Sequence, residues 1–455
     1  MDFDQTIAAI STPSGIGALA IVRLSGLKAF DIVQTIFRSS LHSTDALKSH
    51  HARHGHIQIP ESNEIVDEVM VIPYAKPNSY TGEDVVEISC HGNPLIARRI
   101  LSLCLNNGAR LAKPGEFTQR AFLAGKLDLT QAEAVLDLIQ AKTTRGSLAA
   151  LSTLQGDLGR QIKLIREDLK GLLSTIVASI DFPDEVDQVA ENSIISIVEQ
   201  NLMRLKDLAS TAASGKYLRD GLKLAIVGRP NAGKSSLLNS LLKVERAIVT
   251  DIPGTTRDSL EEDFEINGIP ITLVDTAGMR STEDIVEKIG IERTKKVLCD
   301  SQLVLLVADL TCGWEEEERK IVEAIGDRPW FLLWNKIDLK PNKNLPDTKQ
   351  ALSVCRLSAK TGQGIDQLAK KIEDWVFQQG KLEDSGASLN TRQAALCNQA
   401  VEALQLVKKT LDNGLPQDCL TTDLKLALDS LSEISGVAVS EEVISSVFAN
   451  FCLGK

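Results

Sequence analysis

The sequence predicts a multidomain protein in which an α+β domain comes first and a helical domain, interrupted by an inserted α/β domain, makes up the rest. Three observations predict this fold class. Short β-type runs fill the first part of the chain, apolar residues then recur at three- and four-residue spacing, and one apolar run breaks into a glycine-rich loop. We expect domains at 1–119, at 120–215 together with 381–455, and at 216–380.

The first domain combines short strands with a helix. Pro94 suits the first position of a helix, and Asn-Asn-Gly after Leu105 is a stop signal. Residues at this end of the chain form no pattern of a catalytic triad. Strands are expected at the apolar or alternating runs 6–10, 17–22, 56–59, 67–72 and 85–89.

Histidines are concentrated in the first domain. Five of the six lie between positions 42 and 56, and four of these are crowded together. A metal site is one interpretation, but no cysteine or carboxylate stands at ligand spacing nearby. We therefore expect a strand that alternates between solvent and core. The crowded residues are His50, His51, His54 and His56.

Helical spacing of apolar residues runs from about 118 to 215 and returns from 389 to 455. Long helices are expected here, although glycines interrupt the first stretch. Pro183 would break a helix interior, so another helix should follow at 192–213. Helices on both sides of the inserted domain would form one helical domain. Movements of the inserted domain would then be transmitted to the helical domain and from there to the first domain.

The inserted domain is organised around a phosphate-binding loop. The strand-like run 224–227 leads into Gly-Arg-Pro-Asn-Ala-Gly-Lys-Ser at 228–235, and a helical apolar series follows, which is the setting of the GxxxxGK[ST] motif. Glycines let backbone N–H groups turn towards phosphate, and the helix N-terminus adds its positive dipole. We expect Lys234 to neutralise the β/γ-phosphates and the Ser235 hydroxyl to bind Mg²⁺.

Three further motifs follow later strands of this domain. Asp275 opens Asp-Thr-Ala-Gly and can hold Mg²⁺ through water, and Asp338 ends Asn-Lys-Ile-Asp and can accept hydrogen bonds from N1–H and the 2-amino group of guanine. Ser358-Ala-Lys would contact the base through a main-chain N–H. Four such motifs at the carboxyl ends of successive strands predict GTP as the ligand. The expected contacts are Asn231, Ala232, Gly233, Lys234, Ser235, Ser236, Thr250, Asp251, Ile252, Pro253, Gly254, Thr255, Thr256, Asp275, Thr276, Ala277, Gly278, Asn335, Lys336, Ile337, Asp338, Ser358, Ala359 and Lys360.

The polar, glycine-bearing segment 250–258 stands where such folds keep a mobile switch, and Thr256 is expected to give Mg²⁺ its second hydroxyl. The chain departs from the Ras-like pattern after Gly278, because Met279 follows and a thioether cannot orient water. Another residue must orient it. The candidates are the acids Glu283, Asp284 and Glu287.

The motifs GRPNAGKSS, TDIPGTTRD and DTAGMR, together with FCLGK ending at Lys455, resemble the MnmE (TrmE) family of tRNA-modifying GTPases. The resemblance runs over the whole chain, and the terminal Cys-Leu-Gly-Lys is its most specific sign. It implies a homodimer whose G domains and bound K⁺ activate hydrolysis, and it implies Glu287 as the carboxylate that orients water. A cation against the phosphates would supply the charge that an arginine supplies elsewhere. The implied K⁺ ligands are Asn231, Thr250, Ile252 and Thr255.

For the first domain, the resemblance implies binding of 5-formyl- or methylene-tetrahydrofolate. Cys452 would face the folate, and the flavoprotein MnmG would be the partner in modifying C5 of the wobble uridine, position 34, of certain tRNAs to carboxymethylaminomethyl or aminomethyl uridine. The loop Tyr-Thr-Gly-Glu-Asp at 80–84 carries carboxylates that could bind a pterin edge, although loop acids are often merely solvated. The implied folate ligands are Arg23, Glu83, Lys126 and Lys455.

Composition limits the remaining possibilities. The net charge of −11 is unfavourable for nucleic-acid binding, so RNA contact would need a local basic patch or the surface of a partner. The chain has no apolar run of roughly 18 residues and begins with acidic residues, so we expect a cytoplasmic protein that does not enter the membrane. Eight scattered cysteines without CxxC pairs indicate neither disulfides nor a zinc ribbon.

Two alternative functions stay open. A ribosome-assembly GTPase would share the GRPNAGKS and DxPGTTRD signatures but would leave the first domain and the FCLGK tail unexplained. A regulatory scaffold that binds GTP without hydrolysing it is conceivable because of Met279. Potassium-stimulated hydrolysis would exclude the scaffold.

Overall fold

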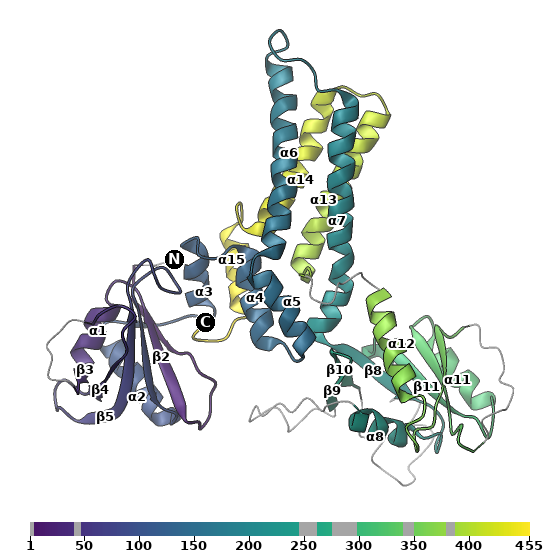
Figure 1. Ribbon diagram of the computed structural model, residues 1–455, viewed down its shortest axis with the longest axis horizontal. Coiled ribbons are helices and arrows are strands. Elements are labelled where there is room, and N and C mark those ends of the chain that lie inside the picture. Colours follow the sequence, from purple (N-terminus) through teal and green to yellow (C-terminus); the bar gives the residue numbers. More distant parts are fainter. Residues whose placement is uncertain (1–3, 41–46, 245–261, 275–297, 340–349, 379–386) are drawn as a thin grey trace. The chain divides into compact units, whose positions relative to one another are not determined.

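The computed structural model describes residues 4–40, 47–244, 262–274, 298–339, 350–378 and 387–455 (Figure 1). The chain divides into two compact units. The first unit comprises residues 1–136 and 431–455, and the second comprises residues 137–430.

The first unit contains a mostly antiparallel sheet with the strand order β3-β4-β5-β6-β2-β1-β7. Only the contact of β1 with β7 is parallel among the strand pairs in the described part of this sheet. The strands expected from the sequence are present, with a short strand added at each edge. Their bounds are β1 Ile7–Ile10, β2 Leu19–Ser25, β3 Phe37–Ser39, β4 Arg53–Gln58, β5 Ile65–Tyr74, β6 Val85–His91 and β7 Arg110–Leu111.

Side-chain alternation along β2 divides the sheet into two faces. Val22 and Leu24 are fully buried in a core with α1 (Ala29–Ile36) and α2 (Pro94–Asn106), as two-residue periodicity requires. Arg23 projects to the opposite face, where it lies near Phe117 of α3 (Glu116–Leu123). This face carries the polar cluster described below.

Part of the histidine segment forms a strand, as expected, because His54 and His56 lie on β4, whereas His50 and His51 precede it. On β4, Gly55 and Ile57 are buried, whereas His54 is exposed and His56 is half-buried. Within the part of the chain that the structure describes, no group of three or more His, Cys, Asp or Glu side chains is placed to hold a metal ion.

The C-terminal tail belongs to the first unit. Phe448 at the end of α15 (Glu441–Ala449) and Phe451 pack with Leu129 and Ala132 in a buried apolar cluster. The following residues reach the sheet, where Ser11 Oγ donates to the carbonyl of Gly454 at 3.0 Å. The tail is therefore an ordered part of the first unit rather than a frayed end.

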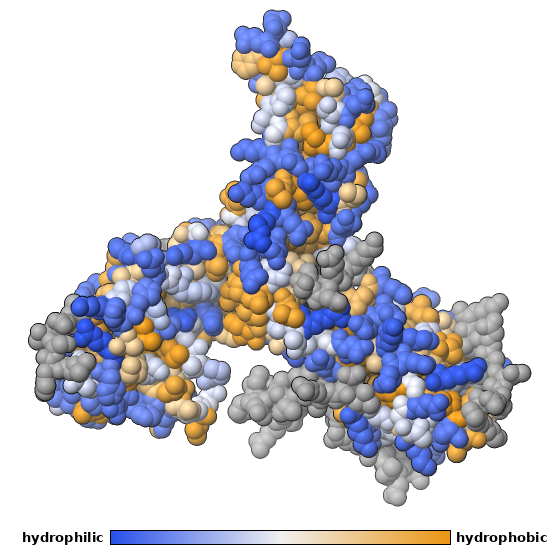
Figure 2. Space-filling view, in the orientation of Figure 1, coloured by the Kyte–Doolittle hydropathy of each residue, from blue (hydrophilic) through white to orange (hydrophobic). Residues whose placement is uncertain are grey.

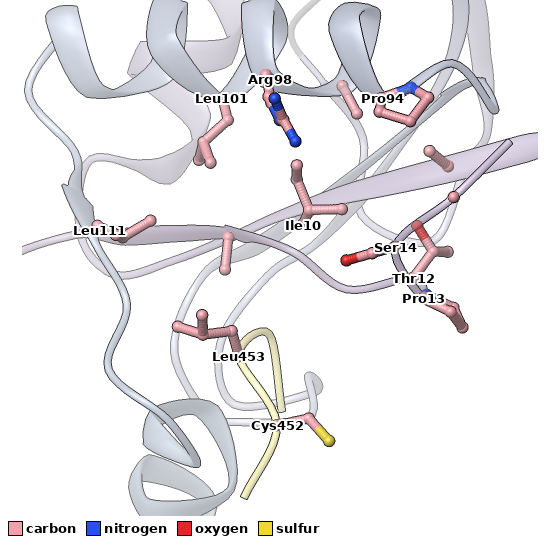
Figure 3. A pocket seen from close by; sticks show the side chains of 14 residues that line it. Ile10, Thr12, Pro13, Ser14, Pro94, Arg98, Leu101, Leu111, Cys452 and Leu453 are labelled. Carbon is pink, nitrogen blue, oxygen red and sulfur yellow. The ribbon is translucent and has the colours of Figure 1, made fainter. Parts of the chain in front are cut away.

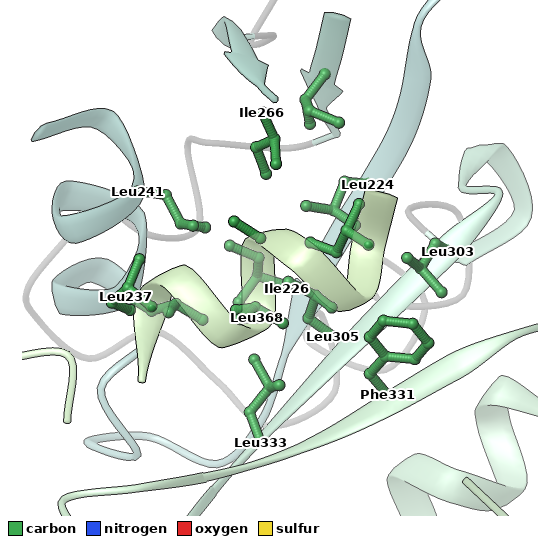
Figure 4. Packing of buried hydrophobic residues seen from close by; sticks show 14 of the residues in the cluster. Leu224, Ile226, Leu237, Leu241, Ile266, Leu303, Leu305, Phe331, Leu333 and Leu368 are labelled. Atoms are coloured by element: carbon green, nitrogen blue, oxygen red, sulfur yellow. The ribbon is translucent and has the colours of Figure 1, made fainter. Parts of the chain in front are cut away.

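The second unit contains the α/β domain, whose sheet has the order β13-β12-β11-β8-β10-β9. Neighbouring strands are parallel except for β9 and β10. Figure 4 shows its core, in which leucines and isoleucines of β8 face those of α8 and α12. The bounds are β8 Leu222–Val227, α8 Lys234–Val244, β9 Glu262–Ile266, β10 Ile269–Leu273, β11 Leu303–Asp309, α11 Glu316–Ile325, β12 Trp330–Asn335, β13 Ser353–Arg356 and α12 Ile365–Gln378.

Helices from before and after the α/β domain pack together, which confirms the predicted interrupted helical domain. Cys397 of α13 (Thr391–Asp412) lies against α7 (Glu191–Asp220), with its Sγ 3.4 Å from the carbonyl of Leu205. Lys408 and Glu199 join the same two helices with an ion pair of 2.5 Å. The visible surface of this bundle carries both hydrophobic and hydrophilic side chains (Figure 2). The other helices are α4 Leu129–Gln140, α5 Thr144–Leu154, α6 Asp157–Asp181, η1 Gln417–Cys419 and α14 Leu420–Ser435.

The expected run of long helices from residue 118 is only partly correct. α6 and α7 are long and are separated at Pro183, as predicted, but α3, α4 and α5 are short. Gly125 and Gly156 adopt φ of +68° and +87°, and this left-handed conformation ends a helix or precedes a new one.

Two expected domain boundaries fall inside helices. The boundary expected after residue 119 lies within α3. The boundary expected after residue 215 lies within α7, because the helix expected at 192–213 continues to Asp220. Its last turn is held by the α/β domain, because Leu218 is 1% exposed in the core of that domain and Tyr217 packs on Trp375 with ring centroids 5.7 Å apart.

Candidate functional site

The loop after β8 has the backbone that a phosphate cradle requires. Gly233 adopts φ of +103°, and a Cβ atom there would lie 2.1 Å from Nδ2 of Asn335, so only glycine fits. Asn231 adopts φ of +62°, which asparagine tolerates better than most residues. The loop therefore turns sharply before α8 begins.

Lys234 is held inside this loop. Its Nζ donates to the carbonyls of Gly228 and Arg229 at 2.8 and 2.7 Å, and burial lowers its pKa. Ser235 and Ser236 follow in the first turn of α8, and the N-terminus of a helix favours anions. The loop thus brings together the ammonium group of Lys234, the N-terminus of α8 and the hydroxyl of Ser235. These are the groups that phosphate and Mg²⁺ binding requires.

Asn335 joins the phosphate loop to the segment after β13. Its Nδ2 donates to the carbonyl of Ala232 at 2.8 Å, and its Oδ1 accepts from the N–H of Ala359 at 2.9 Å. Asn335 is 2% exposed, so both bonds lie in a dry environment. The two motifs that contact opposite ends of a nucleotide are therefore fixed relative to each other.

Lys336 and Asp309 form a second, partly buried link at the base-binding motif. Lys336 adopts φ of +65°, and its Nζ lies 2.6 Å from Oδ2 of Asp309. Burial raises the pKa of Asp309, but hydrogen bonds from Lys336 and Thr311 outweigh it, so that the pKa lies below its usual value. The link keeps the strand end after β12 in place.

These motifs border a cavity of about 610 Å³, a size that suits a nucleotide base and ribose. The exposed carboxylate of Asp338 lies at its wall, as guanine recognition requires. Sequence reasoning predicted Ser236 of α8 but missed Asn239 and Lys243, although the three residues stand at the spacing of one helix face. The lining residues are Gly233, Ser236, Asn239, Ser240, Lys243, Asn335, Lys336, Asp338, Leu339, Ser358, Ala359, Lys360, Thr361 and Gly362.

Several expected contacts lie outside the described residues, and they stay predictions. They are Thr250, Asp251, Ile252, Pro253, Gly254, Thr255, Thr256, Asp275, Thr276, Ala277, Gly278 and Glu287.

A second polar cluster lies on the first unit and contains Arg23 and Lys455. Nε and Nη2 of Arg23 donate to Oε1 of Glu87 at 2.9 and 2.7 Å, and Nη1 donates to the carbonyl of Gly454 at 3.4 Å. Burial and the charge of Arg23 lower the pKa of Lys455. The Arg23 guanidinium also lies 5.7 Å from the ring centroids of both Tyr80 and Phe117.

Glu83 and Lys126 adjoin this cluster. Ser25, two residues along β2 from Arg23, donates from Oγ to Oε2 of Glu83 at 2.6 Å. Lys126 is exposed, and its Cε would lie 3.7 Å from a Cβ atom at Gly82. The structure thus brings the four predicted folate ligands to one region of the first unit.

Cys452 is exposed and borders a different cavity of about 540 Å³ along α2. Figure 3 shows Leu453 pointing towards Ile10 and Leu111, whereas the sulfur of Cys452 points away from them. The backbone N–H of Lys455 donates to the carbonyl of Cys452 at 3.4 Å, so Cys452 adjoins the polar cluster through the main chain.

Comparisons with known proteins match the chain over nearly its whole length. A family model described as the GTP-binding protein TrmE N-terminus matches residues 6–126, and one described as the MnmE helical domain matches residues 129–452. The tRNA modification GTPase MnmE of Enterococcus faecalis is 45% identical over 463 residues, covering 100% of this chain and 99% of the relative. The protein of the same name from Acetivibrio thermocellus is 42% identical over 458 residues, covering 99% of each.

Among solved structures, the G domain of the T. maritima FeoB iron transporter is 29% identical and covers 34% of this chain and 98% of its own, with a TM-score of 0.25. None of the helices in the described ranges is long and apolar enough to span a membrane.

Proposed function

This chain belongs to the MnmE (TrmE) family of tRNA modification GTPases. From that premise we propose that it is a potassium-activated enzyme whose GTP hydrolysis drives modification of the wobble uridine. With the flavoprotein MnmG, it adds an aminomethyl or carboxymethylaminomethyl group to C5 of uridine 34 in certain tRNAs. The added carbon comes from 5-formyl- or methylene-tetrahydrofolate, and the protein acts in the cytoplasm.

The observation that carries the GTPase part is the bridge that Asn335 makes between Ala232 and Ala359. It fixes a phosphate loop and a base-binding loop around one cavity, as a guanine nucleotide requires. Asp338 selects guanine because its carboxylate can accept two hydrogen bonds from N1–H and the 2-amino group.

Metal ions complete the catalytic site in this proposal. Ser235 and Thr256 bind Mg²⁺, and Glu287 orients the attacking water in place of the residue that Met279 cannot supply. A homodimer places K⁺ against the phosphates. Asn231 suits this role, because it is exposed on the phosphate loop and carries an amide oxygen that can bind a cation. The remaining K⁺ ligands are Thr250, Ile252 and Thr255.

The polar cluster of the first unit supports the folate part. Arg23 and Lys455 supply positive charge, Glu83 supplies a fixed carboxylate for the donor edge of a pterin, and Tyr80 and Phe117 supply aromatic surface. Lys126 reaches the same region over Gly82. Cys452 provides a thiol at the edge of the cluster.

Nucleotide-driven movement reaches the helical domain through α5 and α7. Lys142 pairs with Asp263 of β9 at 2.9 Å, and Arg145 pairs with Glu373 of α12 at 3.0 Å. β9 follows directly on the segment that contains Thr256, so a change there is transmitted to these ion pairs. Distances between labels on α7 and on the first unit, measured with GDP and with a GTP analogue, test this transmission of movement.

The complete proposal is tested by reconstitution with MnmG, FAD, substrate tRNA, a tetrahydrofolate donor and GTP in potassium buffer. We expect modified uridine to form and to require GTP hydrolysis. A chain that lacks the last four residues should hydrolyse GTP normally and give no modified uridine. Modification without GTP hydrolysis would favour the regulatory scaffold, and binding to ribosomal subunits without tRNA modification would favour a ribosome-assembly role.

A further inference from the structure

Arg120 occupies the centre of a buried ionic network beside the polar cluster of the first unit. It lies on α3, and its side chain is 2% exposed. Nη1 donates to Oε1 and Oε2 of Glu83 at 3.1 and 2.9 Å, and Nη2 donates to the carbonyl of Gln5 at 2.9 Å and to Oε1 of Glu116 at 3.0 Å. A planar guanidinium with these partners is held in one orientation.

Glu116 accepts hydrogen bonds from both Arg120 and Arg110. The side chain of Glu116 is 3% exposed and accepts from Nη1 and Nη2 of Arg110 at 2.7 and 2.5 Å and from the N–H of Lys113 at 2.9 Å. Positive and negative groups therefore alternate from Arg110 through Glu116 and Arg120 to Glu83. Each buried charge has an opposite partner, as burial requires.

Glu83 forms the exposed end of this network. Its side chain is 29% exposed, and Ser25 Oγ donates to Oε2 at 2.6 Å. Ser25 is itself fully buried and bonded to Thr81, whose Oγ1 lies 2.8 Å away. One nitrogen of Arg120 and one hydroxyl thus hold the carboxylate from the protein side, and acceptor capacity remains on its exposed side.

The same helix shapes the rest of the cluster. Thr118 Oγ1 lies 2.9 Å from the hydroxyl of Tyr80, and Phe117 lies beside Arg23. One turn of α3 therefore positions two aromatic rings together with the carboxylate of Glu83.

We propose that Arg120 is a positioning residue of the folate site, which fixes the Glu83 carboxylate so that it accepts the 2-amino and ring N–H donors of a pterin. This inference rests on the proposed folate binding. Arg120 acts through Glu83 and does not touch the ligand itself. A lysine in its place keeps the charge but presents its three N–H donors from one nitrogen rather than from a planar fork, so it cannot hold Glu83, Glu116 and Gln5 together in this geometry.

Calorimetric titration with 5-formyl-tetrahydrofolate tests the inference on the full chain. Arg120→Lys should weaken binding roughly tenfold or more, because the carboxylate loses its orientation. Ser25→Ala should weaken it in the same direction without changing any charge. The key variant combines Arg120→Lys with Glu83→Gln. It should bind folate no more weakly than Glu83→Gln alone, because both substitutions remove the same interaction, that of the oriented Glu83 carboxylate with the pterin.

Arg99→Lys is the matched control. It makes the same charge-conserving change in an exposed ion pair of the first unit, with Glu64, that is not part of this network, so folate affinity should stay within about threefold of the unsubstituted chain. Circular dichroism checks that each variant is folded.

The outcomes separate the two proposals. If the unsubstituted chain binds folate and Arg120→Lys binds equally well, or if the losses multiply in the double variant, the positioning role is wrong. If the unsubstituted chain binds no folate, the proposed folate function fails and this inference with it.

Discussion

The amide of Asn335 donates a hydrogen bond of 2.8 Å to the carbonyl of Ala232, which ties the end of β12 to the phosphate loop. The same side chain accepts from Ala359, so three motifs far apart in the sequence share one residue. We therefore expect nucleotide affinity to depend on this side chain, which links the two loops that border the cavity.

Asn335→Ala should weaken GTP and GDP binding together. The change leaves the Ala232 carbonyl and the Ala359 N–H without this partner, and each buried polar group left unpaired costs about 1–3 kcal/mol. Titration with a fluorescent guanine nucleotide measures the loss. Affinity equal to that of the unsubstituted chain would show that the loops hold their positions without the bridge.

Asp338→Asn should change which base is bound. An asparagine presents both an acceptor and a donor, so it no longer matches the two donors of guanine but can pair with xanthine, which carries a carbonyl in place of the 2-amino group. We expect GTP affinity to fall and XTP affinity to rise in competition assays. Loss of both affinities would mean that Asp338 supports the fold of the loop rather than the base.

The network around Glu116 should make the first unit sensitive to acid. Burial raises the pKa of Glu116, but hydrogen bonds from Arg110, Lys113 and Arg120 outweigh it and the pKa is lowered. A carboxylate with a lowered pKa stabilises the fold fully above its unfolded value of about 4.3, and that contribution is lost as pH falls through the folded value.

Glu116→Gln should therefore differ most from the unsubstituted chain near neutral pH, and the difference should shrink as the pH falls below about 4.3. Hydrogen exchange of α3 amides, corrected for intrinsic rates, reports this locally. Tryptophan fluorescence serves as the control, because all four tryptophans, at positions 314, 330, 334 and 375, belong to the second unit. A constant difference across the pH range would contradict the assigned pKa direction.

Thiol labelling should divide the eight cysteines into two groups. Burial raises the pKa of Cys90 to about 11, that of Cys104 and Cys397 to about 12, and also that of Cys355, so these four should react only after unfolding. The exposed thiols should react in the native protein, and mass spectrometry of labelled peptides identifies them. They are Cys299, Cys312, Cys419 and Cys452.

Local signals were sufficient for much of the fold and for the nucleotide site. Gly233, Lys234 and Asp338 belong to motifs whose spacing is tied to a strand end, so they could be placed from sequence. The end of α7 could not, because Leu218 continues the helix only through packing against the α/β domain. A tertiary contact there overrides the glycine at 215.

Arg120 shows why the sequence did not predict the rest of the polar cluster of the first unit. Glu116 and Arg120 stand four residues apart on a helix, a pattern that usually marks a solvated surface pair. Only the tertiary structure reveals that both side chains are buried and that Arg120 pairs with Glu83, which lies in a loop far away in the sequence. Without the family resemblance, Lys126 would have had no distinguishing signal either.

The most direct test of the central claim is GTP turnover by the purified protein in KCl and in NaCl at equal ionic strength. Asn231→Gly is the informative variant, since glycine accepts φ of +62° without strain and removes the side chain whose amide oxygen is proposed to bind K⁺. We predict faster turnover in KCl for the unsubstituted protein and no difference between the salts for the variant. Equal turnover in both salts for the unsubstituted protein would contradict potassium activation.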